Sequence, residues 1–156
     1  MNQADFSRVI EKYWDTVFRI ALNYHRNVSD AEDTTQEVMF KLYTYEKNFD
    51  SDEHIRNWLI RVTINNCKSV LRSFWQRQRP TPDELMDAVH FDNHESSELF
   101  QAVMSLPQQH RTVLYLYYYE DITTKEIAEL LNQKEAHIRT RLSRARNKLK
   151  EVWQDE

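Results

Sequence analysis

The C-terminal segment 133–150 carries seven basic side chains and one acidic side chain, a local charge of +6. If this segment is a helix, with about 100° between successive residues, one narrow stripe is apolar and the opposite side is polar. The apolar stripe consists of Ile138, Leu142, Ala145 and Leu149. The polar side carries His137, Thr140, Ser143 and Arg144, bordered by Arg139, Arg141, Arg146 and Lys148. Such side chains bond to base edges and neutralise phosphates, so this face predicts duplex nucleic-acid binding; a solvated helix face is the alternative.

A second cationic segment covers residues 53–79, where six basic side chains accompany one acidic side chain. The segments before and after it are acidic, with net charges of −4 over residues 1–52 and −8 over residues 80–132. The 156-residue chain has a net charge of −4, so the basic charge is concentrated in two separate places. This distribution suggests two contacts with a polyanion.

Other kinds of chemistry are poorly supported by the composition. The chain has no glycine, which dinucleotide-binding folds and phosphate loops need for close backbone approach. The single cysteine, Cys67, excludes an internal disulfide and a cysteine-rich metal site, and we expect it to fill apolar space. His90 and His94 flank Asp92 with a spacing that can hold a metal, but a convincing third ligand is missing. We therefore expect no catalytic residue, no metal and no cofactor.

The pattern of apolar residues predicts helices throughout the chain. A first helix includes residues 6–24, and Ser29 with Glu32 forms a capping box for a second helix that ends near Tyr45. A third helix begins at Asp50 or Ser51. Its apolar stripe consists of Ile55, Trp58, Leu59 and Val62, but polar residues stand at the next expected positions, 65, 66 and 69. We predict a break between residues 63 and 69 followed by a fourth helix; a continuous helix with buried amides is the alternative.

Pro80 and Pro82 begin an acidic, weakly periodic stretch that is typical of a linker. Helical periodicity resumes at Leu99, and Pro107 suits the first turn of another helix. Thr123 and Glu126 form a capping box, and a turn at residues 132–133 precedes the basic helix 134–153, which is a helix-turn-helix pattern. The prediction is an all-α protein with two small helical domains, 1–79 and 96–156, joined by a flexible linker, 80–95. Charged residues recur throughout, so no membrane insertion is expected.

Four motifs resemble the extracytoplasmic-function (ECF) group of bacterial RNA polymerase sigma factors. Residues 30–38, DAEDTTQEV, resemble the region 2 pattern DAED..QEV, and residues 58–65, WLIRVTIN, resemble WL.RI..N. Residues 106–113, LPQQHRTV, together with Ile127 and Ala128, resemble the start of region 4, and residues 141–146, RLSRAR, resemble SRLSRAR. The motifs occur in the family's order and span nearly the whole chain, whereas Ala136 stands where the family often has glycine.

The resemblance implies a sigma factor that binds core RNA polymerase and directs promoter-specific initiation without being an enzyme. Its region 2 would dock on the clamp coiled coil of the polymerase through Asp33, Gln36 and Glu37, and helical spacing places Phe40 on the same outward side. The −10 element would be bound as an unpaired strand, with Asn65 and Ser69 contacting bases. The cations expected at its phosphates are Lys68, Arg72, Arg77 and Arg79.

At the −35 element the family's contacts correspond to Arg139, Thr140, Ser143 and Arg144, which overlap the polar face derived from periodicity. His137, Arg141 and Arg146 complete the predicted −35 surface. The resemblance further implies an anti-sigma factor as a partner and a cytoplasmic protein that is nucleoid-associated within the holoenzyme. The alternative is a free-standing helix-turn-helix regulator with an N-terminal partner-binding domain, which stable sequence-specific DNA binding without polymerase would favour.

Overall fold

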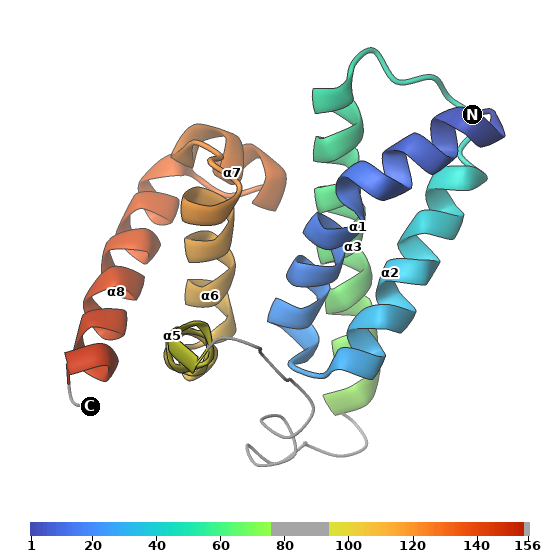
Figure 1. The fold of residues 1–156 in the computed structure, drawn as a ribbon. Helices are drawn as coiled ribbons and strands as arrows, with labels where there is room; N and C mark the ends of the chain where they lie inside the picture. The colour runs from blue at the N-terminus through green and yellow to red at the C-terminus, as the bar shows by residue number, and fades with distance from the viewer. Residues whose placement is uncertain (76–93, 155–156) are drawn as a thin grey trace. The chain divides into compact units, whose positions relative to one another are not determined.

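The computed structural model describes residues 1–75 and 94–154. These residues form helices and their connections and contain no strand, so the predicted all-α class is confirmed. The chain divides into two compact units, Met1–Pro80 and Thr81–Glu156 (Figure 1). Within the predicted linker, residues 80–93 lie outside the described residues, and residues 94–95 already belong to a helix.

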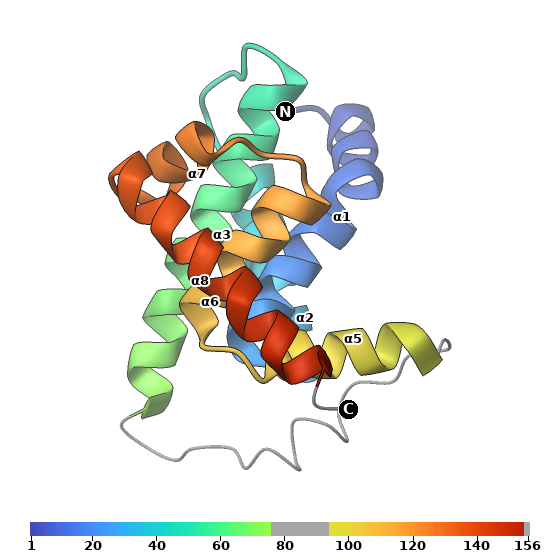
Figure 2. The same ribbon diagram turned by 90° about the vertical axis from the view of Figure 1, so that its left-hand side faces the viewer.

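Three helices that pack pairwise against one another form the first unit (Figures 1 and 2). They are α1 (Gln3–His25), α2 (Val28–Tyr43) and α3 (Asp52–Trp75). Each helix contributes apolar side chains to one core. The core consists of Val9, Tyr13, Val17, Val38, Met39, Leu42, Ile55 and Leu59. Burial of these side chains removes apolar surface from water, which is the dominant favourable contribution to folding.

Short polar side chains cap the three helices of the first unit. Asn2 Oδ1 accepts from the Asp5 amide at 2.8 Å, and Ser51 Oγ accepts from the His54 amide at 3.1 Å. The predicted cap at Ser29 is wrong, because Asn27 Oδ1 accepts from the Asp30 amide at 3.0 Å and α2 begins at Val28. Arg26 ends α1 in the left-handed conformation, with φ 58°, so the chain reverses early enough for Asn27 to become the cap.

The predicted break near residues 63–69 is also wrong, because α3 continues from Asp52 to Trp75. The inward stripe shifts around the helix instead of stopping. It continues through Ile60, Thr63, Ile64 and Cys67, which are all buried and follow i, i+3, i+4, i+7 spacing. The Thr63 hydroxyl is satisfied by donating to the Leu59 carbonyl at 2.6 Å. Asn66 is a buried amide, as the continuous-helix alternative expected, whereas Asn65 and Ser69 are exposed.

Cys67 is fully buried in this stripe, and burial raises the pKa of its thiol to about 12. Burial disfavours the thiolate, which is the reactive form of cysteine. The prediction that Cys67 fills apolar space is therefore confirmed.

The second unit consists of four α-helices and one short π-helical segment within the described residues. They are α5 (His94–Met104), α6 (Gln108–Leu114), η1 (Tyr115–Tyr119), α7 (Thr124–Leu131) and α8 (Glu135–Gln154). Helices α5, α6 and α7 each pack against α8. Buried Leu116, Ile122 and Ile127 supply apolar surface, and Ile138 does so from α8.

The predicted helix-turn-helix is formed by α7 and α8. Thr123 caps α7 by accepting from the Glu126 amide at 3.2 Å, as its capping pattern predicted. Asn132 ends α7 with φ 54°, and the Gln133 amide donates to the Ala128 carbonyl at 2.8 Å. Asparagine tolerates the left-handed conformation, so this turn forms without glycine. Ala136 lies inside α8, where glycine is not required.

None of the described helices combines the length and apolar composition that crossing a membrane would need.

Candidate functional site

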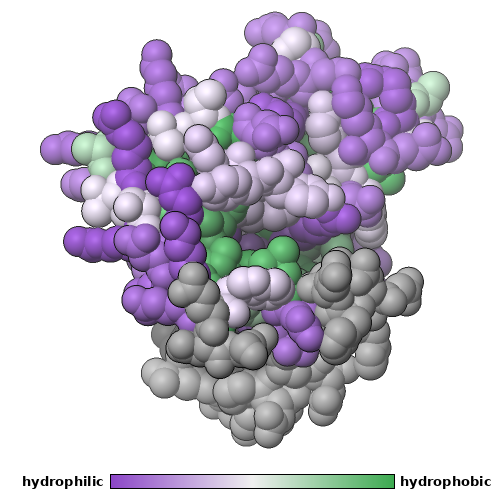
Figure 3. Space-filling model, turned by 60° about the vertical axis from the view of Figure 1, so that its left-hand side comes forward, coloured by the Kyte–Doolittle hydropathy of each residue, from purple (hydrophilic) through white to green (hydrophobic). Residues whose placement is uncertain are grey.

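The two sides of α8 differ sharply in exposure. The predicted apolar stripe is confirmed, because Ile138, Leu142 and Ala145 are buried and Leu149 is half-buried. The predicted DNA-contact residues lie away from it. His137, Arg139, Thr140, Ser143, Arg144 and Arg146 are exposed, and Arg141 is half-buried. In the view of Figure 3, which brings the α8 side of Figure 1 forward, hydrophilic side chains cover much of the visible surface.

Two of the cations on α8 are oriented by hydrogen bonds. Arg141 Nη2 donates to Gln133 Oε1 at 3.1 Å, which ties the helix to the preceding turn. Arg146 Nη1 donates to the Tyr118 hydroxyl at 3.0 Å, and this bond raises the pKa of the guanidinium. Both side chains remain permanently charged and are held in defined directions, which suits contact with phosphates.

A hollow of about 360 Å³ lies beside the exposed face of α8. Thr140, Arg141 and Arg144 line it from α8, together with His137. Gln109 and His110 line it from α6. These two α6 residues could not be selected from the sequence, because they lie 25 and 26 positions before the start of α8 and no local pattern connects them with it.

In the first unit, one side of α3 is polar and cationic. Asn65, Lys68, Ser69 and Arg72 are exposed on it. Arg72 Nε donates to the Lys68 carbonyl at 3.4 Å, which holds the guanidinium against the helix. Arg77 and Arg79 lie outside the described residues, and so do the side chains of Phe74 and Trp75.

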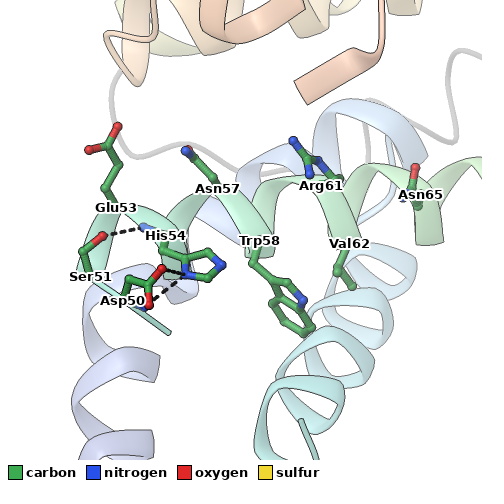
Figure 4. A pocket seen from close by; sticks show the side chains of 9 residues that line it. All are labelled: Asp50, Ser51, Glu53, His54, Asn57, Trp58, Arg61, Val62 and Asn65. Atoms are coloured by element: carbon green, nitrogen blue, oxygen red, sulfur yellow. Dashed lines mark hydrogen bonds and ion pairs between the residues drawn. The ribbon is translucent and has the colours of Figure 1, made fainter. Parts of the chain in front are cut away.

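Asn65 lies at one end of a hollow of about 500 Å³ along the first half of α3. The hollow is lined by Asp50, Ser51, Glu53, His54, Asn57, Trp58, Arg61, Val62 and Asn65. Figure 4 shows Asn57, Arg61 and Asn65 pointing to one side of α3, whereas Trp58 and Val62 point to the other. Asn57 Oδ1 is buried and has no hydrogen-bond partner among the described residues. Sequence reasoning missed Asn57 and Arg61, although their i, i+4 spacing with Asn65 was available as a signal.

The outward side of α2 carries the four residues predicted to bind polymerase. Asp33, Gln36, Glu37 and Phe40 are all exposed. Ala31, Thr35, Val38 and Leu42 are buried on the inward side, as helical spacing predicted. Phe40 is 67% exposed, which is unusual for a phenylalanine, and Tyr43 beside it is 50% exposed. Glu37 also forms an ion pair with Lys41 at 3.8 Å. An exposed aromatic beside polar groups is typical of a protein interface.

No group of three or more His, Cys, Asp or Glu side chains within residues 1–75 and 94–154 has metal-binding geometry. Of the weak metal motif, His90 and Asp92 lie outside the described residues, and only the backbone of His94 is described.

Two family models match the chain in the order of its two units. The Sigma-70 region 2 model matches residues 9–77, and the Sigma-70 region 4 model matches residues 102–151. The region 2 match contains α2 and α3, and the region 4 match contains α6, α7 and most of α8.

Similar proteins share this organisation along nearly their whole length. ECF RNA polymerase sigma factor SigW of Bacillus subtilis (strain 168) is 26% identical over 177 residues, covering 99% of this chain and 91% of that protein. ECF RNA polymerase sigma factor SigM of the same organism is 28% identical over 153 residues, covering 93% of each. Among solved structures, the sigma factor RpoE in complex with the anti-sigma factor NepR from Bartonella quintana has a fold similar to this chain. Its TM-score is 0.75 at 18% identity, over 96% of this chain and 97% of that one.

Proposed function

The chain belongs to the ECF group of sigma-70 factors, and on this premise we propose how its residues act. Proteins of this group are not enzymes. They direct promoter-specific transcription initiation by RNA polymerase. The first unit binds core polymerase and the −10 element, and the second binds the −35 element. The boundaries proposed for these domains are 1–79 and 96–156, with 80–95 as the linker. The observation that carries the assignment is the exposed polar face of α8, opposite a fully apolar stripe.

Core polymerase binds the outward side of α2. Asp33, Gln36 and Glu37 provide hydrogen-bond acceptors and negative charge, and Phe40 provides an aromatic anchor. This assignment is supported by the exposure of all four residues on one side of a helix whose other side is buried. Aromatic residues are enriched at the centres of protein interfaces, and truncating them removes much of the binding energy. The expected partner surface is the clamp coiled coil of the polymerase.

The −10 element binds along α3 as an unpaired strand. The hollow of about 500 Å³ next to Asn65 has room for a flipped base, and Asn65 supplies an amide that can pair with a base edge. Ser69 lies one helical turn further along, and Lys68 and Arg72 provide the charge that neutralises phosphates. Arg77 and Arg79 extend this cationic stretch in the sequence.

The −35 element binds α8 in the major groove. Base edges face His137, Arg139, Thr140, Ser143 and Arg144, while Arg141 and Arg146 bind phosphates. The reading residues lie in the N-terminal half of α8, which is the half that helix-turn-helix proteins insert deepest. We place the protein in the bacterial cytoplasm, associated with the nucleoid as part of the holoenzyme.

An anti-sigma factor is the further partner that we propose. RpoE, which has the same fold, was solved in complex with the anti-sigma factor NepR. The exposed aromatic side chains Phe40 and Tyr43 are available on this chain for such a protein, and occupying them would block the surface assigned to polymerase.

Core binding tests the assignment of α2. The double substitution Gln36→Ala and Glu37→Ala should abolish binding of the full chain to core polymerase, measured by co-elution on a sizing column. The matched control is Gln3→Ala with Glu11→Ala, which changes the same residue types at exposed positions of α1 and should retain binding. Binding that survives the α2 substitutions would overturn the assignment. Failure of the unmodified chain to bind core polymerase would favour the free-standing regulator.

A further inference from the structure

The hollow between α6 and α8 is built entirely from neutral and basic side chains. Gln109 and His110 line it from α6. His137, Thr140, Arg141 and Arg144 line it from α8. No carboxylate is among these lining residues, although acidic side chains outnumber basic ones in the chain as a whole, 25 to 21. A site of this composition favours an anion with several acceptor oxygens.

His110 lies in a strongly positive environment. Burial lowers the pKa of its imidazole, and the nearby cations Lys148, Arg141 and Arg144 lower it further. All three cations come from α8, so they converge on a residue of a different helix. Like charges held close together are unfavourable unless an anion neutralises them.

The imidazole also has an unused hydrogen-bonding atom. His110 Nδ1 is buried and has no partner among the described residues. A buried polar atom without a partner is energetically unfavourable. His110 is half-buried and lines the hollow, so an N–H on the accessible side of its ring can donate to a phosphate oxygen there, and that bond would be strong because the acceptor is charged.

We propose that this hollow binds one backbone phosphate of the −35 duplex, with His110 as the contact that α6 contributes alongside Arg141 and Arg144. The inference rests on the proposed function, since Thr140 and Arg144 also belong to the α8 face assigned to the duplex. An anion bound in the hollow would therefore lie next to the DNA that binds this face. A backbone phosphate of the same duplex is an anion that lies there whenever the bases contact α8.

The DNA-binding surface would then consist of two parts, one on α8 and one on α6. The recognition helix enters the groove, and α6 holds the adjacent backbone, which fixes how α8 is oriented. Phosphate contacts of this kind set register and orientation and carry no sequence information themselves. His110 is thus a positioning residue for promoter recognition.

The test uses the full chain and a fluorescein-labelled duplex of random sequence, with affinity measured by anisotropy over a range of salt concentrations. His110→Gln should weaken binding about tenfold, the effect of losing a charge-assisted hydrogen bond. His110→Lys should make the slope of log K against log salt steeper by about 0.9, the value for one additional neutralised phosphate. Gln101→Lys is the matched control, because it adds the same charge at an exposed position of α5, outside the hollow. It should leave the slope unchanged.

The outcomes separate this proposal from the function on which it rests. Arg146→Ala tests the proposed function alone and should reduce both affinity and slope. If it does so while His110→Gln and His110→Lys behave like the unmodified chain, the hollow holds no phosphate and the proposed function stands. If the unmodified chain does not bind the duplex, both fail. Inorganic phosphate that displaces the duplex from the unmodified chain, at constant ionic strength, but not from His110→Gln would assign the hollow to small anions and overturn the DNA assignment. Circular dichroism verifies that each variant is folded.

Discussion

Arg139 and Arg146 illustrate how similar side chains on α8 are assigned to different tasks. Arg139 is exposed in the first half of the helix, at the border of the polar face. Arg146 is held by the Tyr118 hydroxyl at 3.0 Å, which directs its guanidinium toward η1. An arginine in the reading half of a recognition helix can contact a base edge through both of its terminal nitrogens, whereas a tethered one further along is suited to a phosphate.

These different roles predict different effects of truncation. Arg139→Ala should cost about 1–3 kcal/mol at the promoter and relax the preference at one base pair of the −35 element. Arg146→Ala should weaken binding to every sequence by a similar factor and leave the preferences unchanged. Holoenzyme binding to duplexes with single substitutions in the −35 element measures both effects. An unchanged base preference in Arg139→Ala would contradict its assignment as a base reader.

Residue exposure on α8 and α2 could be predicted from the sequence because both helices follow a regular 3.6-residue period. His110 could not be predicted in the same way. Its Nδ1 atom is buried without a partner in the folded chain, and no local pattern encodes that property. The position of His110 depends on packing between segments that are distant in the sequence.

At the scale of elements, α3 shows where periodicity is misleading. Trp58 and Val62 were assigned to the inward stripe, but they lie on its flank. Trp58 packs against Tyr45 and Phe49, with ring centroids 4.9 Å and 5.7 Å away. This aromatic cluster is an apolar surface beside the main core. The true stripe follows Ile55, Leu59 and then residues 60, 63, 64 and 67, so the helix needs no break.

The junction of α1 and α2 depends on a buried histidine. His25 Nε2 and Thr34 Oγ1 lie 2.8 Å apart, and both residues are buried. Burial lowers the pKa of His25 below its ordinary value of 6.5, although Asp30 and Asp33 oppose this shift. The folded state therefore keeps His25 neutral at a pH where the unfolded chain already protonates it. The contribution of neutral His25 to the free energy of unfolding is fully present above pH 6.5. It is lost progressively as the pH falls from 6.5 toward the folded-state pKa.

His25→Gln should remove this part of the pH dependence. The melting temperature of the unmodified chain should fall more steeply below pH 6.5 than that of the variant, because only the unmodified chain must keep His25 uncharged. The corresponding difference in the free energy of unfolding is about 1.4 kcal/mol for each unit by which the folded-state and unfolded-state pKa values of His25 differ. Thermal unfolding followed by circular dichroism measures it. Equal pH dependence in both proteins would show that His25 is not the group responsible.

At the scale of the whole molecule, the two kinds of nucleic-acid contact that we propose are divided between two units. The first unit contains the α2 side assigned to polymerase and the α3 side assigned to the unpaired −10 strand. The second contains the helix-turn-helix assigned to duplex DNA. The charge distribution predicted two contacts because the two cationic segments, 53–79 and 133–150, are separated in the sequence of an acidic protein, and in the structure they fall in different units.

The two-domain, all-α organisation could be predicted from composition, capping patterns and the order of the family's motifs. The boundaries of individual helices were harder to predict from the sequence. Asn27 and Ser29 are both suitable caps, and only the left-handed turn at Arg26 determines which of them caps α2.

Transcription in vitro tests the central claim most directly, since it requires polymerase binding, −35 recognition and −10 opening together. The template is the region upstream of the chain's own gene, transcribed by bacterial core polymerase with and without the full chain. We predict a discrete transcript that depends on the chain, disappears with Gln36→Ala and Glu37→Ala, and persists with Gln3→Ala and Glu11→Ala. A transcript that is unaffected by the α2 substitutions, or tight sequence-specific DNA binding by the chain alone with no transcript, would contradict it.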